Sequence, residues 1–178
     1  MAAAVQSAPG SHIQGWMSEG ELRWLCQTAK EMQSVAEVGC WKGRSTFALC
    51  ASRCPLVYAV DHFKGSDEPE HRAIIQSEGE PLKHFLYNMR QFNNLHVVIA
   101  DSVQGAEMVS AVDMVFLDAS HEYASVVRDI QAWKPKAKKL LCGHDFLSGD
   151  VQRAVFEQCK GLIVTYQSIW YFSTEGKN

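Results

Sequence analysis

Acidic side chains follow nearly every apolar segment that could form a strand, and one histidine accompanies them. The residues at these segment ends are Glu37, Asp61, Asp101, Asp118 and the pair His144-Asp145. Carboxylates and imidazoles can hold a divalent cation, accept hydrogen bonds from hydroxyl groups and move protons. One aspartate in such a place could be no more than a turn residue or a helix cap. Several together favour a ligand site with metal or acid–base chemistry.

The segments that must position these residues alternate between apolar runs and amphipathic stretches. Ser18 and Glu21 have the spacing of a capping box, which marks the start of the first helix. The polar stretch 63–80 is predicted to be a long loop or lid. Strands are predicted over 34–38, 56–60, 96–100, 112–117, 140–143, 162–165 and 169–172, and helices over 19–32, 44–52, 81–92, 103–109, 121–133 and 150–159. This alternation indicates an α/β fold with a mostly parallel sheet, in which ligands bind at the carboxyl ends of the strands.

Length and composition limit the class of protein. The 178 residues are enough for one domain, which we place at 16–178, after a flexible N-terminal arm at 1–15. The net charge of −3 disfavours a nucleic-acid partner. No apolar run approaches the length of a membrane-spanning helix, and no secretory signal is recognised. The six cysteines lack C-x-x-C spacing and fit a reducing compartment. We therefore expect a cytoplasmic protein with neither a nucleic-acid nor a membrane partner.

Two glycines, Gly39 and Gly43, lie between the first predicted strand and the next helix, where a ligand can approach the backbone closely. The dinucleotide fingerprint G-x-G-x-x-G is not met, because Trp41 and Arg44 stand where it needs glycine. A nicotinamide-dependent oxidoreductase is therefore disfavoured. Asp61 lies 18 residues after Gly43, a suitable distance for binding the ribose hydroxyls of a nucleoside.

Three segments together resemble class I S-adenosylmethionine-dependent methyltransferases. Residues 36–46 are similar to motif I of that family, and Asp61 is similar to the acidic end of its second strand. Residues 116–123 and 143–145 resemble the paired D-x-x-H-x-Y and G-H-D signatures of a small subfamily, whose members include macrolide-sugar O-methyltransferases and cephalosporin-modifying enzymes. The resemblance covers about 16–173. It implies a Rossmann-like three-layer sandwich around a mostly parallel seven-stranded sheet with one antiparallel strand.

The resemblance also implies S-adenosylmethionine as the cofactor. It places Glu37 and Gly39 at the methionine part, Asp61 at the ribose, and Asp101 with Ser102 beside the adenine. The full set that we expect to bind the cofactor is Glu37, Gly39, Trp41, Gly43, Ser45, Asp61, His62, Asp101, Ser102 and Asp118. Aromatic residues near the same rim either stack on a ligand or belong to the core; they are Trp16, Trp41, Phe63 and Tyr123.

The same resemblance suggests how catalysis would work. Asp118 and Asp145 match positions that hold a divalent cation, magnesium or manganese, and His121 matches a proposed general base. The expected catalytic residues are His121 and Asp118, and the expected metal ligands are Asp118, His144 and Asp145. His144 replaces the usual acidic residue, which weakens the case for magnesium and favours a transition metal. His121 or Asp145 could instead be a helix cap, and His144 could have only a structural role.

The most favoured function is O-methylation of a small-molecule or sugar hydroxyl by a protein that could form a homodimer. Two other functions stay open. The chain could be a catalytically silent protein that binds S-adenosylmethionine. It could also be a metal-dependent hydrolase that uses Asp118, His121, His144 and Asp145.

Overall fold

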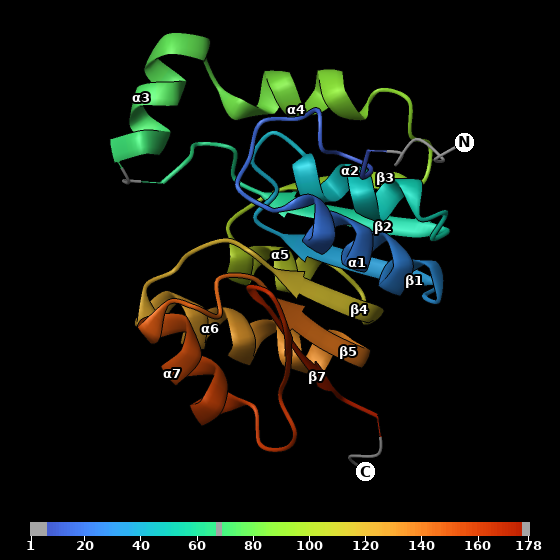
Figure 1. Ribbon diagram of the computed structural model, residues 1–178, viewed down its shortest axis with the longest axis vertical. Coiled ribbons are helices and arrows are strands. Elements are labelled where there is room, and N and C mark those ends of the chain that lie inside the picture. The colour runs from blue at the N-terminus through green and yellow to red at the C-terminus, as the bar shows by residue number, and fades with distance from the viewer. Residues whose placement is uncertain (1–6, 67–68, 176–178) are drawn as a thin grey trace, which may run out of the picture.

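The strands of the computed structural model, which describes residues 7–66 and 69–175, form one mixed sheet (Figure 1). Its strand order is β3-β2-β1-β4-β5-β7-β6. β7 pairs antiparallel with both of its neighbours, while the other pairings between adjacent strands are parallel. The strands are β1 (Ser34–Val38), β2 (Leu56–Asp61), β3 (Leu95–Ile99), β4 (Val112–Leu117), β5 (Ala137–Gly143), β6 (Val164–Tyr166) and β7 (Ile169–Ser173). The predicted seven-stranded, mostly parallel sheet with one antiparallel strand is confirmed.

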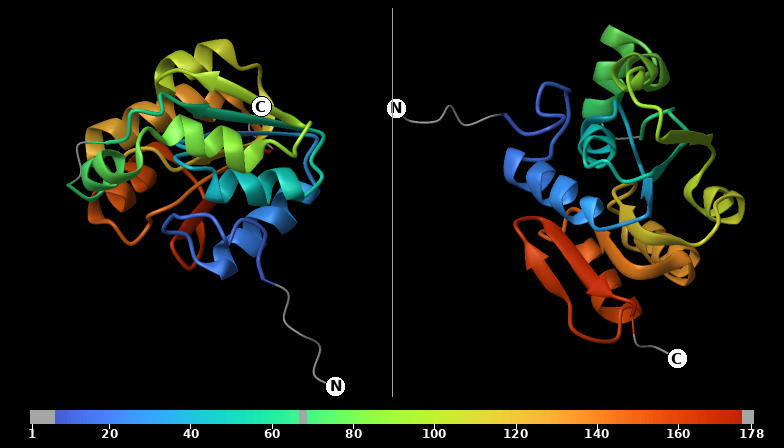
Figure 2. Two further views of the ribbon diagram at one scale, coloured as in Figure 1. Left: turned by 90° about the horizontal axis from the view of Figure 1, so that it is seen from above. Right: turned by 90° about the vertical axis from the view of Figure 1, so that its right-hand side faces the viewer.

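Helices cover both faces of the sheet and complete three layers (Figure 2). On one face α1 (Glu19–Lys30) packs against α2 (Arg44–Ala51), which also contacts α4 (Pro81–Met89). On the other face α6 (Tyr123–Trp133) lies between α5 (Ser102–Met108) and α7 (Gly149–Gln158). A short 3-10 helix, Lys134–Lys136, joins α6 to β5. In the described ranges, no helix has the length and apolar character needed to span a bilayer.

The core lies on the two faces of the central strands. Every residue of β4 is buried, which fits a strand covered by helices on both sides. On the face of α6 and α7, the indole rings of Trp133 and Trp170 are almost completely buried. On the other face, Leu22 and Leu25 from α1 are fully buried in the core. The helix layers therefore hold the carboxyl ends of the central strands in fixed positions.

The segment 63–80 contains α3 (Pro69–Glu78), so the prediction of a loop throughout is wrong. None of the residues of α3 is buried. A helix without a buried face leaves no periodic apolar pattern in the sequence, which explains why it was missed. The end of α3 is tied to the body of the protein by a salt bridge of 2.7 Å between Glu78 and the buried Lys42.

The described half of the expected N-terminal arm (1–15) lies against α2. Ala8 and Ile13 are buried. The Arg44 guanidinium donates hydrogen bonds to the carbonyl oxygens of Ser11 at 2.9 Å and Ile13 at 2.5 Å. This part of the chain is thus bound to the helix that follows the glycine-containing segment.

Candidate active site

The predicted acidic residues do meet at one edge of the sheet. β1 has β2 on one side and β4 on the other, so the chain order reverses there. The carboxyl ends of these strands bring Glu37, Asp61 and Asp118 to this reversal point, and Asp145 follows β5 beside them. Such a reversal point is where open α/β sheets bind ligands.

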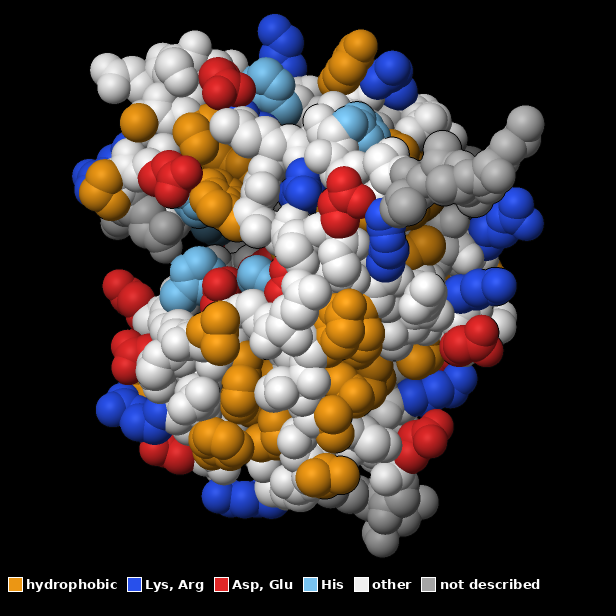
Figure 3. Space-filling view, viewed as in Figure 1, with side chains coloured by type: hydrophobic (Ala, Val, Ile, Leu, Met, Phe, Trp, Pro, Cys, Tyr) orange, Lys and Arg blue, Asp and Glu red, His pale blue; other side chains and the backbone are white. Residues whose placement is uncertain are grey.

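Figure 3 shows a hollow at this edge, on the side toward which the parallel strands point in Figure 1. The hollow opens between the region of α3 and the region of α6 and α7, and histidine and acidic side chains gather along its lower rim. A small pocket at the carboxyl ends of the strands is lined by residues that include Asp118, His121, His144 and Asp145. The residues predicted to be catalytic therefore line one pocket, with the side chain of His121 41% exposed and that of Asp118 19% exposed.

Residues 39–43, the glycine loop, connect β1 to α2 and pass close to the end of β4. Gly39 has a φ of +90°, and a Cβ added there would lie 2.2 Å from the carbonyl oxygen of Asp118. The amide of Asp118 donates to the carbonyl oxygen of Val38 at 2.8 Å. Glycine is thus needed at 39 to let the ends of β1 and β4 touch. Gly43, with a φ of +92°, is the N-cap residue of α2.

Asp61 holds the glycine loop in place. One carboxylate oxygen, Oδ2, accepts hydrogen bonds from the amides of Cys40 at 2.7 Å and Trp41 at 2.9 Å. The other, Oδ1, accepts from the amide of Phe63 at 2.6 Å. Because each carboxylate oxygen can accept two hydrogen bonds, Oδ1 keeps one position for a ligand hydroxyl. This loop-holding role of Asp61 is additional to the ribose contact that the sequence predicted.

Glu37 is fully buried beneath the glycine loop. Its Oε2 accepts a hydrogen bond of 2.5 Å from the Thr46 hydroxyl, and its Oε1 has no hydrogen-bond partner among the described residues. Burial raises the pKa of the carboxyl to about 7, and hydroxyl groups at the start of α2 oppose that rise. An unpaired buried acceptor is costly unless a donor meets it, so Oε1 is suited to a cationic ligand group such as an ammonium.

The other residues predicted to bind the cofactor have partners of their own. Asp101 caps α5 by accepting from the amide of Gln104 at 2.9 Å. The Ser102 hydroxyl accepts from the indole of Trp133 at 3.1 Å. Nδ1 of the half-exposed His62 accepts from a neighbouring amide at 3.0 Å, and Ser45 is buried at the start of α2. Their contacts with a cofactor stay a prediction.

His121 pairs with Asp145 across the rim of the site. Its Nε2 lies 2.9 Å from Oδ2 of Asp145. The helix α6 begins at Tyr123 with Glu122 as its N-cap residue. The predictions that His121 starts this helix or caps it are therefore wrong. Asp145 is likewise not an N-cap, because Ser148 occupies that position before α7. Both side chains are thus directed to the site by the loops that carry them.

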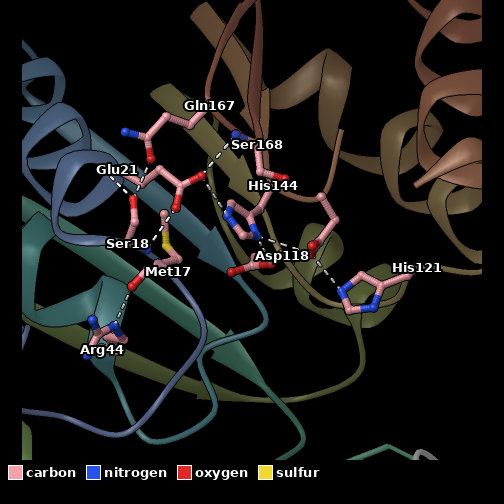
Figure 4. Close-up of polar contacts among 10 residues, drawn as sticks. Met17, Ser18, Glu21, Arg44, Asp118, His121, His144, Gln167 and Ser168 are labelled. Carbon is pink, nitrogen blue, oxygen red and sulfur yellow. Dashed lines mark hydrogen bonds and ion pairs between the residues drawn. The ribbon is translucent and has the colours of Figure 1, made fainter. Parts of the chain in front are cut away.

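The metal-ligating group that the structure offers differs from the predicted one. Ligand atoms of Asp118, His121 and Asp145 all lie within 4.8 Å of one another. His144 is instead held by carboxylates at both ring nitrogens: its Nε2 lies 3.1 Å from Oε1 of Glu21, and its Nδ1 lies 3.1 Å from Oδ2 of Asp145 (Figure 4). With both nitrogens engaged, His144 has no lone pair for a metal. His121 therefore replaces His144 in the candidate metal group.

The charges of this cluster are shared between imidazoles and carboxylates. Burial lowers the pKa of His144, but its hydrogen bonds to Asp145 and Glu21 and the charge of Asp118 outweigh this and raise it to about 10. Burial raises the pKa of Asp118 to about 8, with Asp145 adding to the rise and His144 and His121 opposing it. Burial also favours a raised pKa at Asp145, yet hydrogen bonds from His121 and His144 hold it well below its usual range. At neutral pH the cluster contains a cationic His144 and an anionic Asp145.

Three aromatic rings stack near the glycine loop. The His71 ring, from α3, lies parallel to the Trp41 ring at 4.5 Å and contacts the ring of the exposed Trp16 at 4.8 Å. Of the other aromatic residues predicted near the rim, Phe63 is buried and belongs to the core. The hydroxyl of Tyr123 donates to Glu157 on α7. Trp16 and Trp41 are therefore the rim aromatics that remain candidates for stacking on a ligand.

Glu21 is a member of the site that sequence reasoning missed. It was recognised as half of a capping box, which accounts for one of its oxygens. The other oxygen reaches His144, which lies 123 positions away in the chain. The capping motif explained the residue locally and gave no sign of this distant contact.

Comparison with known proteins identifies the class of the fold and site. A family described as a methyltransferase domain matches residues 36–146, which include the glycine loop and the His121 and Asp145 segments. No curated protein sequence matches the chain. The chain belongs to this methyltransferase-domain family and is an S-adenosylmethionine-dependent methyltransferase.

Solved structures share the fold at low sequence identity. The cofactor-bound Rv0187 protein from MTB is 16% identical, covers 88% of this chain and 80% of its own, and superposes with a TM-score of 0.65. A protein from Staphylococcus aureus, assigned as a caffeoyl-CoA O-methyltransferase, is 13% identical over 89% of this chain and 84% of its own, with a TM-score of 0.64. The SAH-bound methyltransferase PaMTH1 of Podospora anserina is 10% identical over 88% and 78%, with a TM-score of 0.62. These likenesses support the Rossmann-like methyltransferase fold, while the predicted subfamily stays a prediction.

Proposed function

We propose that this methyltransferase acts on a hydroxyl group of a small molecule or sugar, with His121 as the general base. The observation that carries the proposal is the contact of 2.9 Å between His121 Nε2 and Asp145 Oδ2 at the open edge of the sheet. A histidine oriented by a carboxylate is suited to remove a proton from a weak nucleophile. The O-methyltransferase assignment of the Staphylococcus aureus neighbour agrees with a hydroxyl acceptor.

The residues that would hold S-adenosylmethionine fit its chemistry. Asp61 has an acceptor position left for a ribose hydroxyl, and the glycine loop that it holds lets the backbone approach the ligand. The unpaired Oε1 of Glu37 matches the ammonium of the methionine part. When bound, the cofactor supplies a methyl group on a positively charged sulfur, which an acceptor oxygen can attack in line.

His121 would handle the proton of the acceptor. With Nε2 donating to Asp145, Nδ1 is the ring nitrogen without a proton in the neutral tautomer, and it takes the hydroxyl proton as the oxygen attacks. Asp145 then stabilises the imidazolium. His144 in turn keeps Asp145 ionised, because it donates to the same oxygen. Rate enhancement would come mainly from positioning of the two reactants and from this proton transfer.

A metal-assisted version of the reaction is the second candidate, favoured by the grouping of Asp118, His121 and Asp145. Two carboxylates and one imidazole suit manganese or another transition metal better than magnesium. A cation held there would bring a Lewis acid to the acceptor oxygen. His121 would then be a ligand and would not serve as the base, so the two versions exclude each other at this residue.

The test compares His121→Ala with His96→Ala, which removes an exposed histidine of the edge strand β3. Acceptors are found by screening hydroxylated small molecules and sugars with methyl-labelled S-adenosylmethionine. For His121→Ala we expect kcat to fall by about 10²–10⁴, with unchanged affinity for S-adenosylhomocysteine, and for His96→Ala no change. Equal rates in the two variants would contradict a base role.

Chelation separates the two versions. Full activity of the wild type in EDTA, with activity lost in His121→Ala, supports His121 as the base. Activity that disappears in EDTA and returns with Mn²⁺ supports the metal-assisted reaction and refutes the base.

A further inference from the structure

Glu21 uses both of its carboxylate oxygens although it is almost completely buried. Oε2 accepts from the amide of Ser18 at 2.8 Å and so completes the capping box of α1. Oε1 accepts from the amide of Ser168 at 3.0 Å and from His144 Nε2 at 3.1 Å. A capping box needs only one oxygen of this side chain, and its acidic residue is commonly exposed. Burial of the second oxygen against His144 therefore calls for another explanation.

From Glu21 a line of contacts leads to the proposed base (Figure 4). His144 meets Glu21 through Nε2 and Asp145 through Nδ1, at 3.1 Å each. The Asp145 oxygen that His144 contacts, Oδ2, is also the one that lies 2.9 Å from His121 Nε2. Glu21 and His121 thus hold opposite ends of a chain of two carboxylates and two imidazoles. The chain joins α1 to the segments after β5 and β4.

Each link of this chain restricts the next. Asp145 has a φ of +57°, a conformation that residues other than glycine adopt rarely, so its placement depends on the contacts around it. His144 can fix the Asp145 carboxylate only if its own ring is held in place. Glu21 holds that ring through Nε2, the nitrogen that does not contact Asp145. Glu21 is itself anchored by Ser168, in the turn between β6 and β7.

We propose that Glu21 is a positioning residue of the methyl-transfer site: through His144 it fixes Asp145 and thereby sets the orientation of His121. This inference rests on the proposed role of His121 and names a residue, outside the matched range 36–146, on which that role depends. Glu21 touches neither of the proposed reactants. We expect substitution of Glu21 to change kcat and the environment of the His121 ring, and to leave the affinity for the cofactor unchanged.

The experiment compares Glu21→Ala with Ser18→Ala. Both variants break the capping box, so both should unfold at a lower urea concentration than the wild type from this loss alone. Only Glu21→Ala also breaks the contact with His144. We expect Glu21→Ala to lower kcat by about 10–100-fold with unchanged affinity for S-adenosylhomocysteine, while Ser18→Ala stays within about twofold of the wild type. Equal kcat losses in the two variants would show that Glu21 serves the helix alone.

A double-mutant cycle tests the route through His144. If Glu21 acts through that ring, adding Glu21→Ala to His144→Gln should lower kcat no further than His144→Gln does. Additive losses would overturn the route.

A spectroscopic measurement needs no acceptor. The ¹⁵N signals of the His121 ring should move in Glu21→Ala and stay in place in Ser18→Ala, although Glu21 does not contact His121. Unmoved His121 signals in Glu21→Ala would refute the inference even if transfer activity is found. Moved signals in a protein that transfers no methyl group would instead refute the proposed function and leave the coupling established.

Discussion

Replacing Asp61 by Asn keeps the size of the side chain but removes its charge and one of its acceptor oxygens. In the wild type, three backbone amides donate to this carboxylate, from Cys40 at 2.7 Å, Trp41 at 2.9 Å and Phe63 at 2.6 Å. Asn has an NH₂ group in place of one carboxylate oxygen. Whichever way the amide is turned, this NH₂ group lies opposite at least one of the backbone N–H groups and cannot accept its hydrogen bond. The glycine loop therefore loses part of its support.

The cost follows from the burial of the side chain, which is only 13% exposed. An N–H group left without an acceptor costs about 1–3 kcal/mol, and each remaining hydrogen bond loses about 1 kcal/mol with the charge. We expect the free energy of unfolding of Asp61→Asn to fall by about 2–4 kcal/mol. Affinity for S-adenosylhomocysteine should fall at least about tenfold, because the loop and the ribose acceptor are both disturbed.

Urea unfolding at pH 7 measures this change, with Asp101→Asn as the matched control. Asp101 also follows a strand, but its carboxylate accepts from one backbone amide, that of Gln104, as a helix cap. Asn caps helices about as well as Asp, so this control should change stability by less than about 0.5 kcal/mol. If Asp61→Asn costs no more than the control, the carboxylate does not hold the loop and the reasoning is wrong.

Two further substitutions test the same edge of the sheet. Gly39→Ala would place a Cβ 2.2 Å from the carbonyl oxygen of Asp118 and should lower the free energy of unfolding by about 3 kcal/mol or more. Gly79→Ala, at a similar φ but with open space around it, should lower it by about 1 kcal/mol in thermal or urea unfolding. Similar losses in the two variants would argue against the close approach. Burial raises the pKa of Glu37 from 4.5 to about 7. As the pH rises, the unfolded chain therefore loses this proton before the folded protein does, and about 3 kcal/mol of stability is lost between pH 4.5 and 7. Glu37→Gln cannot ionise and should lack that part of the pH dependence in unfolding from pH 4 to 8; an unchanged profile would show that Glu37 does not cause it.

Much of the fold follows from local sequence patterns. The buried strand β4 is apolar apart from Asp113, and the polar residue that follows such a strand marks the edge where ligands bind. The capping box at Ser18 predicted the start of α1 correctly, because both of its contacts lie within one helical turn. The segment of α3 carried no such signal, since the helix has no buried face and is held by single contacts such as that between Lys42 and Glu78.

The site was predictable in its location and less so in its connections. Strand ends brought Glu37, Asp61 and Asp118 together as expected, because parallel strands align their carboxyl ends. The partner of His144 could not be read from the sequence, because Glu21 is distant in the chain and reaches the site only through the packing of α1. This contact turns an expected metal ligand into a ring held between two carboxylates.

Calorimetric titration of the wild-type protein with S-adenosylhomocysteine is the most direct test of the cofactor site, because it needs no knowledge of the acceptor. We expect saturable binding at one site per chain, weakened at least about tenfold in Asp61→Asn and unchanged in His121→Ala. Absence of measurable binding at millimolar ligand would contradict the assignment of this edge of the sheet as a methyltransferase site.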